Sequence, residues 1–154
     1  MSEATLQADI QRELLRLTSL FSTGDIVIND WSILDKANAG APYVNILSSD
    51  TLEVEDIQID SNLTRWTIPF YVIVKFTDWD ESRSALGTTR QSVIDQLKVT
   101  ESYQDASGRL AWGLRGIRSL EPVSEIYDRY VENPEESLPV FLAHKLGAVV
   151  EEVI

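Results

Sequence analysis

The residue types that could carry catalysis are scarce in this chain of 154 residues. It contains one histidine, His144, and no cysteine, so a Ser–His–acid site would depend on His144, and thiolate chemistry is excluded. His144 lies between Leu142 and Leu146, in an alternating apolar pattern typical of a strand. We therefore expect this imidazole to be packed or bonded to a partner side chain, since no nucleophile motif accompanies it.

Three neighbouring acids, Asp78, Asp80 and Glu81, are the candidates for a metal site, because carboxylates are ligands of hard cations. The same residues also suit the start of a helix, where Asp78 can cap the first turn and acids are stabilised by the helix dipole. The helix start is the simpler interpretation. No glycine-rich phosphate-binding motif is present, so we expect a non-enzymatic protein with no catalytic residue, no metal and no cofactor.

The chain is strongly acidic, with 25 acids against 13 bases and a net charge of −12. Much of this charge falls in two blocks, residues 50–60 and 121–136. Such a surface repels phosphate, which disfavours proteins that wrap or read nucleic acid. The acids either keep the protein soluble or form a surface that DNA passes without binding. With neither a signal peptide nor an apolar run long enough to span a bilayer, we expect a soluble intracellular protein.

These residues must be positioned by a scaffold whose clearest element is a long strand from Trp66 to Phe76. Its even positions are all large and apolar, whereas its odd positions are mixed, which predicts one core face and one mixed face. Burying six large side chains contributes roughly 9–18 kcal/mol, about what ordering eleven backbone residues costs. We therefore expect Tyr71, Ile73 and nearby Trp79 to be covered as well, either by a helix of the same chain or by a neighbouring subunit.

The remaining pattern predicts a single α+β domain over residues 1–154, with a mainly antiparallel sheet, a long β-hairpin and two helices packed on one face. The helices are expected at about 2–22 and 80–99, and strands at about 26–76 and 110–153. A change of phase within Leu52–Ile59 predicts a bulge or a short break in the strand that forms the hairpin with Trp66–Phe76. The finer expectations are a loop at Asn29–Pro42, a turn at Asp60–Asn62, a polar loop at Tyr103–Gly108, a weak strand at Leu110–Leu120 ended by Pro122, an irregular acidic segment at Val123–Ser137 and a closing strand at Pro139–Val153.

This layout resembles the tail terminator proteins of tailed bacteriophages. The similarity extends from about Ala4 to Glu152 and rests on the order of the elements and the pattern of apolar residues within them. Its components are an N-terminal helix, the strand entry Pro42-Tyr43-Val44 after a loop, the hairpin ending in Trp66-Thr67-Ile68-Pro69-Phe70-Tyr71-Val72-Ile73-Val74, an amphipathic helix, and a late acidic loop before a final strand.

The resemblance implies a small α/β protein that closes into a six-membered ring on the head-proximal end of the tail tube. Such a ring ends tube polymerisation and presents a surface to the head connector, without any covalent step. The implied partners are five further copies of the chain in a ring of six, the tail tube protein, and the connector or neck proteins. DNA would pass through the lumen without specific binding, and the protein would reside in the virion after assembly in the host cytoplasm.

Six copies would bring together −72 formal charges, which apolar contacts and the few bases must offset. The residues expected at the subunit interface are Tyr71, Ile73, Trp79, Arg115 and Arg118, with Lys145 as a further base. Those expected to face the lumen are Glu53, Glu55 and Asp60. Two alternatives stay open: another neck or head-completion protein of the same assembly, and a small cytoplasmic enzyme or binding domain that uses the concave side of the sheet.

Overall fold

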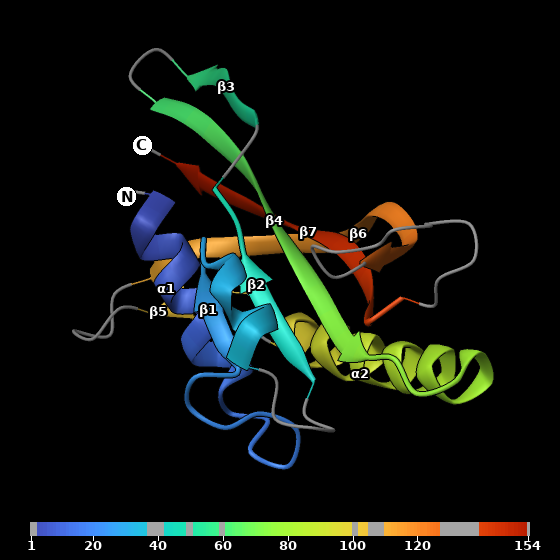
Figure 1. Ribbon diagram of the computed structural model, residues 1–154. Helices are drawn as coiled ribbons and strands as arrows, with labels where there is room; N and C mark the ends of the chain where they lie inside the picture. The colour runs from blue at the N-terminus through green and yellow to red at the C-terminus, as the bar shows by residue number, and fades with distance from the viewer. Residues whose placement is uncertain are drawn as a thin grey trace.

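The structure, a computed structural model (Figure 1), describes residues 3–36, 42–48, 51–58, 61–99, 102–104, 110–126 and 139–153. Its side chains are described at 4–33, 42–48, 66–98 and 139–150. The helices are α1 (Glu3–Leu14) and α2 (Trp79–Val99), with a 3₁₀ helix η1 (Trp31–Lys36). The strands are β1 (Ile26–Ile28), β2 (Tyr43–Ile46), β3 (Thr51–Gln58), β4 (Ser61–Lys75), β5 (Ser102–Gln104), β6 (Leu110–Ile126) and β7 (Phe141–Val153).

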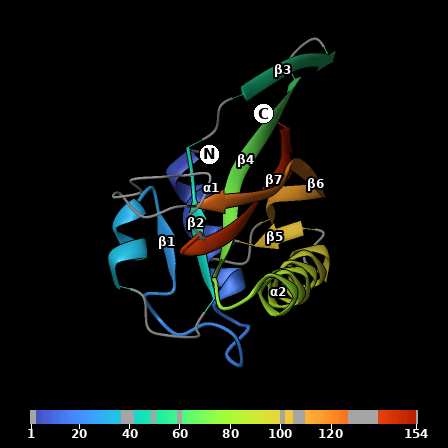
Figure 2. The same ribbon diagram turned by 45° about the vertical axis from the view of Figure 1, so that its right-hand side comes forward.

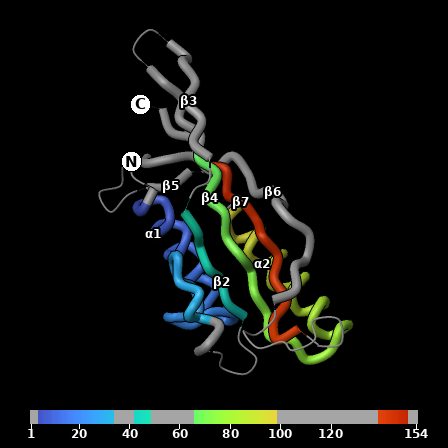
Figure 3. Tube along the Cα trace, turned by 45° about the horizontal axis from the view of Figure 1, so that its top comes forward, coloured from blue at the N-terminus to red at the C-terminus, as the bar shows by residue number. Residues whose placement is uncertain are grey.

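The strands of the described segments form one seven-stranded sheet in the order β1-β2-β4-β7-β6-β5, with β3 paired to β4 beside β2. Only the β1–β2 pair is parallel among these ladders. Figure 3 shows β2, β4 and β7 side by side with α2 behind them. This is the expected α+β fold, a mainly antiparallel sheet with a long hairpin and two helices on one face.

The central strand β4 alternates as its sequence predicts. It pairs with β7 from Leu63 to Lys75, and its even side chains from Trp66 to Val74 face the two helices. Ile68, Phe70 and Val72 have no exposed surface, because they pack in one core with side chains of α1 and α2. The core residues contributed by the helices are Leu6, Ile10, Leu14, Leu86, Val93 and Leu97.

The first helix is shorter than expected, so the prediction of a helix to residue 22 is wrong. After Leu14 the chain makes tight turns, in which the amides of Arg16 and Leu17 donate to carbonyls only three residues earlier. Residues 18, 19, 22 and 23 are Thr or Ser, whose side chains compete with helical hydrogen bonds. Phe21 is nevertheless buried in the core, which explains why the apolar pattern extends past the end of the helix.

Three further expectations about loops are wrong. The predicted loop at 29–42 contains η1, and the predicted turn residues Ser61 and Asn62 belong to β4. The short strand β5 lies partly in the predicted polar loop at 103–108, where pairing with β6 overrides a weak local pattern. The bulge expected in the hairpin is confirmed, because the β3–β4 register shifts between Asp56 and Gln58.

Strand β6 continues past Pro122, which was expected to end it, and includes the first residues of the segment expected to be irregular. Its register against β7 shifts between Ser119 and Val123, so Pro122 falls in a stretch without regular ladder pairing. Proline lacks the N–H that a ladder requires, and such an irregularity is where a strand tolerates it. The rest of the expected irregular segment, 127–138, lies outside the described residues.

Candidate functional site

His144 lies on β7, between β4 and β6, on the face that α2 covers. It is only 6% exposed, and Arg90 of α2 donates a hydrogen bond of 2.8 Å from Nη1 to its Nδ1. An arginine has donors alone, so Nδ1 is the acceptor and the neutral imidazole carries its proton on Nε2. The expectation that His144 is bonded to a partner side chain is confirmed.

The surroundings of His144 favour its neutral form. Burial lowers the pKa of the imidazole because it removes water from the charged form, and the positive charge of Arg90 lowers it further. This arrangement forms a hydrogen bond between helix α2 and the sheet. The Nδ1 lone pair of the imidazole accepts from the Arg90 guanidinium, so it is not free to accept a proton from a substrate hydroxyl.

The three acids considered as metal ligands stand at the start of α2. The Asp78 carboxylate accepts a hydrogen bond of 2.8 Å from the Glu81 amide, which is the expected N-cap. Ser82 closes the same turn, since its amide donates to the Asp78 carbonyl and its hydroxyl accepts from the Thr77 amide. Within the described residues no group of three or more His, Cys, Asp or Glu side chains is placed to hold a metal ion.

The sheet face opposite the helices has a second, smaller core. Ile73 has no exposed surface there, because it packs with Ile33 of η1, Tyr43 of β2 and Phe141 of β7. Of the two expected ways of covering Ile73, a helix of the same chain is therefore the one observed, and the side chain is not exposed to a neighbouring subunit. The same chain covers this face with a 3₁₀ helix, an element that the sequence did not indicate.

An aromatic cluster remains accessible beside this second core. Trp31 of η1 is 44% exposed and meets the ring of Tyr71 edge-on, with ring centroids 5.1 Å apart. The ammonium of Lys145 lies 5.8 Å from the centroid of the same ring. Sequence reasoning selected Tyr71 but missed Trp31, although a tryptophan among the polar residues Asn29, Asp30 and Ser32 is itself a signal of an exposed aromatic side chain.

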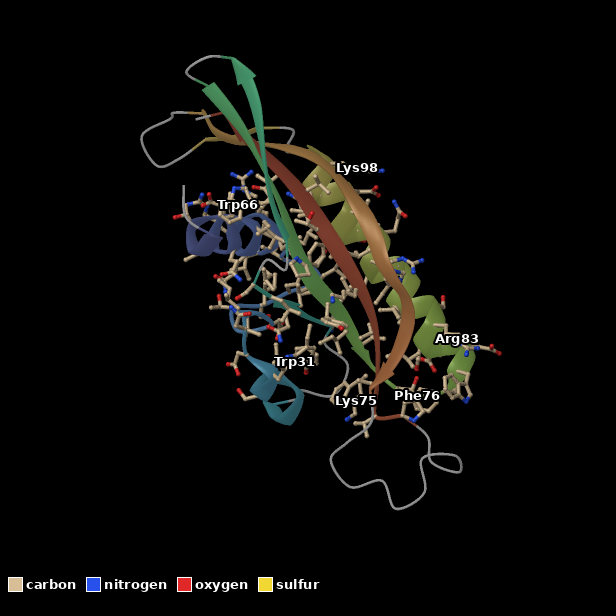
Figure 4. All side chains as sticks on the ribbon, turned by 90° about the horizontal axis from the view of Figure 1, so that it is seen from above. Trp31, Trp66, Lys75, Phe76, Arg83 and Lys98 are labelled. Atoms are coloured by element: carbon tan, nitrogen blue, oxygen red, sulfur yellow. The ribbon has the colours of Figure 1, made fainter. Side chains whose placement is uncertain are left out.

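Trp79, another residue expected at an interface, packs largely within its own chain. Its ring meets Phe76 edge-on at 5.0 Å, and the Arg83 guanidinium lies 4.7 Å above it. Figure 4 shows Lys75, Phe76 and Arg83 toward one end of the molecule and Trp66 toward the other, nearer β3. The end of β4 that leads into α2 is thus rich in aromatic and basic side chains.

The opposite end of β4 carries the residues expected to face a lumen. Glu53 and Glu55 lie on β3, paired with Arg65 and Leu63 of β4. Asp60 lies outside the described residues, and so do the side chains of Glu53 and Glu55. The backbones of Arg115 and Arg118 lie in β6, with Arg118 opposite Gly147, and their side chains are likewise outside the described part. The two Glu residues therefore lie on β3 and the two Arg residues on β6, and their expected roles stay predictions.

Trp66 stands where the β3–β4 hairpin joins the body. Its indole is partly buried against the main core, yet its buried Nε1 has no hydrogen-bond partner among the described residues. A buried donor without a partner costs about 1–3 kcal/mol.

We predict that Trp66→Phe changes the free energy of unfolding by no more than about 1 kcal/mol, because losing the unpaired N–H offsets the loss of ring contacts. Urea denaturation provides the measurement. Trp79→Phe is the matched control, since that partly buried indole has no buried unpaired Nε1 and gains no such offset. A larger loss for Trp66→Phe than for Trp79→Phe would contradict the prediction.

Neither a scan against models of known protein families nor a search of curated proteins finds a match to this chain. In the described part of the structure no helix has the length and apolar character needed to cross a membrane.

Proposed function

We propose that this chain is a non-enzymatic structural subunit that forms a ring with copies of itself and caps the tail tube of a bacteriophage. In this role it ends tube polymerisation and presents the surface that joins the head, as the resemblance to tail terminator proteins implies. Its mechanism is geometric, because docking on a tube end removes the site at which the next tube subunit would add.

The observation that carries the proposal is an acidic arm that extends beyond the body of the domain. The arm consists of β3, residues 61–65 of β4 and residues 151–153 of β7, which pair with one another. Figures 1 and 2 show it projecting away from α2. A hairpin that extends beyond the body of a domain suits contact with a neighbouring molecule.

The distribution of charge supports the same function. The arm contains five acids, Glu53, Glu55, Asp56, Glu151 and Glu152, against the single base Arg65. The rest of the chain holds 20 acids against 12 bases, a smaller acidic excess for its much greater length. A ring built from a chain with this excess of acids repels the DNA backbone and lets DNA pass without being held.

The mass of the protein in solution and its effect on tubes test the proposal. We expect sedimentation or native mass spectrometry to show an assembly of about 104 kDa, six times the 17.3 kDa chain, alone or with tube protein. Added to polymerising tube protein from the same phage, it should occupy one tube end in electron micrographs and shorten the tubes. Tubes that grow to full length with bare ends in its presence would contradict the proposal.

A further inference from the structure

The two ends of β4 differ in charge and in aromatic content. At one end lies the acidic arm, with a net charge of −4 over β3, residues 61–65 and residues 151–153. Toward the other end lies a surface formed by Trp31, Tyr71 and Lys75, which we call the Trp31 surface. Tyr71 and Lys75 share a face of β4, and η1 places Trp31 against Tyr71.

The Trp31 surface has the character of a docking site. Among the described residues, Trp31 is the large hydrophobic residue whose side chain is exposed, at 44%. Aromatic side chains that stand out in this way are typical anchors of protein interfaces. Two lysines, Lys75 and Lys145, lie on the same face, and the nearby acid is Asp30, so the described bases outnumber the described acids there. The surface therefore suits an acidic partner.

The acidic arm cannot reach this surface within one molecule. Glu53 pairs with Arg65, and Tyr71 lies six residues further along β4, roughly 20 Å away. A second copy of the chain can present its arm, because complementary patches at opposite ends of one molecule produce a head-to-tail contact that closes into a ring when the rotation permits. We propose that the acidic arm of one copy docks on the Trp31 surface of the next. This inference rests on the proposed ring and names the contact that holds it together.

Complementary variants test a head-to-tail contact directly. The surface variant is Trp31→Ala with Lys75→Glu, and the arm variant is Glu53→Lys with Glu55→Lys. We expect each variant alone to raise the concentration of half-assembly about tenfold or more in sedimentation velocity. An equal mixture should stop at dimers, since each pair then holds one intact arm and one intact surface.

The matched control is Lys98→Glu, which makes the same charge change on exposed Lys98 of α2, away from Lys75 (Figure 4). It should assemble as the wild type does. Circular dichroism and the urea midpoint of every variant should match the wild type, because Trp31 and Lys75 lie outside the main core.

The absence of cysteine allows an independent test by crosslinking. Ser32→Cys mixed with Glu53→Cys should give a disulfide-linked pair of chains under mild oxidation, because Ser32 is exposed beside Trp31. Ser32→Cys mixed with Asp95→Cys, an exposed acid of α2, is the control and should give far less product.

The outcomes separate this contact from the ring itself. Wild-type rings together with surface and arm variants that assemble equally well would overturn the contact and leave the ring in place. Variants that form rings but no longer bind tubes would also overturn it, because the Trp31 surface would then face the tube protein. Wild-type protein that stays monomeric at about 1 mM, alone and with tube protein, would contradict the ring and the contact together.

Discussion

Replacing Ile73 by alanine is expected to lower the free energy of unfolding by about 2–5 kcal/mol. Ile73 has no exposed surface and packs against Ile33, Tyr43 and Phe141 in the core under η1. Truncation removes buried apolar contacts and leaves a cavity that strands β2, β4 and β7 cannot close, because their ladders hold them apart. Urea denaturation of the isolated protein measures this loss as a lower midpoint.

The milder variant Ile73→Val serves as the graded control and should cost about 0.5–1.5 kcal/mol, since it removes a single methylene. The comparison also decides which molecule covers this face of the sheet. If a neighbouring subunit buried Ile73, the alanine variant would keep the monomer's stability and would lose assembly instead. A normal urea midpoint for Ile73→Ala would therefore contradict the second core described here.

Local sequence patterns were sufficient to predict the elements whose structure follows from a regular repeat or from residues a few positions apart. The alternation from Trp66 to Phe76 predicted both faces of β4, and the change of phase near Ile57 predicted the bulge opposite β4. Asp78 with Glu81 three residues later predicted the start of α2. In each case the deciding interaction lies within a few residues or follows from a regular repeat.

The remaining features depend on contacts between distant residues, which no local pattern encodes. Burial of Phe21 extends the apolar stripe beyond Leu14, although the backbone leaves the helix there. Strand β6 passes Pro122 because its pairing with β7 resumes at Val123. The 3₁₀ helix η1 is held against the sheet partly by Asn45, whose Oδ1 accepts a hydrogen bond from the Asp30 amide 15 residues away.

The same distinction applies to the candidate site residues. A strand register predicted that Tyr71 and Ile73 share a face, but not that η1 buries one of them and leaves the other beside Trp31. The partner of His144 was also beyond prediction, because Arg90 is 54 residues away and the two meet only when α2 crosses β7. The sequence thus identified the side chains that could form contacts, and tertiary packing determined which of them remain accessible.

The burial of His144 beside Arg90 makes the stability of the protein depend on pH. Because the pKa of His144 is lowered in the folded state, the unfolded state binds more protons between the lowered value and about 6.5, the ordinary pKa of histidine. Stability therefore falls as the pH drops below about 6.5, with a contribution from His144 of at most about 1.4 kcal/mol per pH unit. The slope fades above that value, and about one pH unit higher His144 is largely neutral in both states.

His144→Gln isolates this effect, because an amide oxygen can accept the hydrogen bond from Arg90 but does not titrate. The free energy of unfolding of both proteins should be measured by urea denaturation at pH 7.5, 6.5 and 5.5, above the ordinary pKa range of carboxylates. His144 is the only histidine of the chain, so no other imidazole titrates in this interval. The wild type should lose stability between pH 6.5 and 5.5 more steeply than His144→Gln, and the difference between their slopes should be smaller between pH 7.5 and 6.5. Equal slopes throughout would show that protonation does not oppose the packing of α2 on β7, and burial together with the Arg90 charge would then not hold the imidazole neutral.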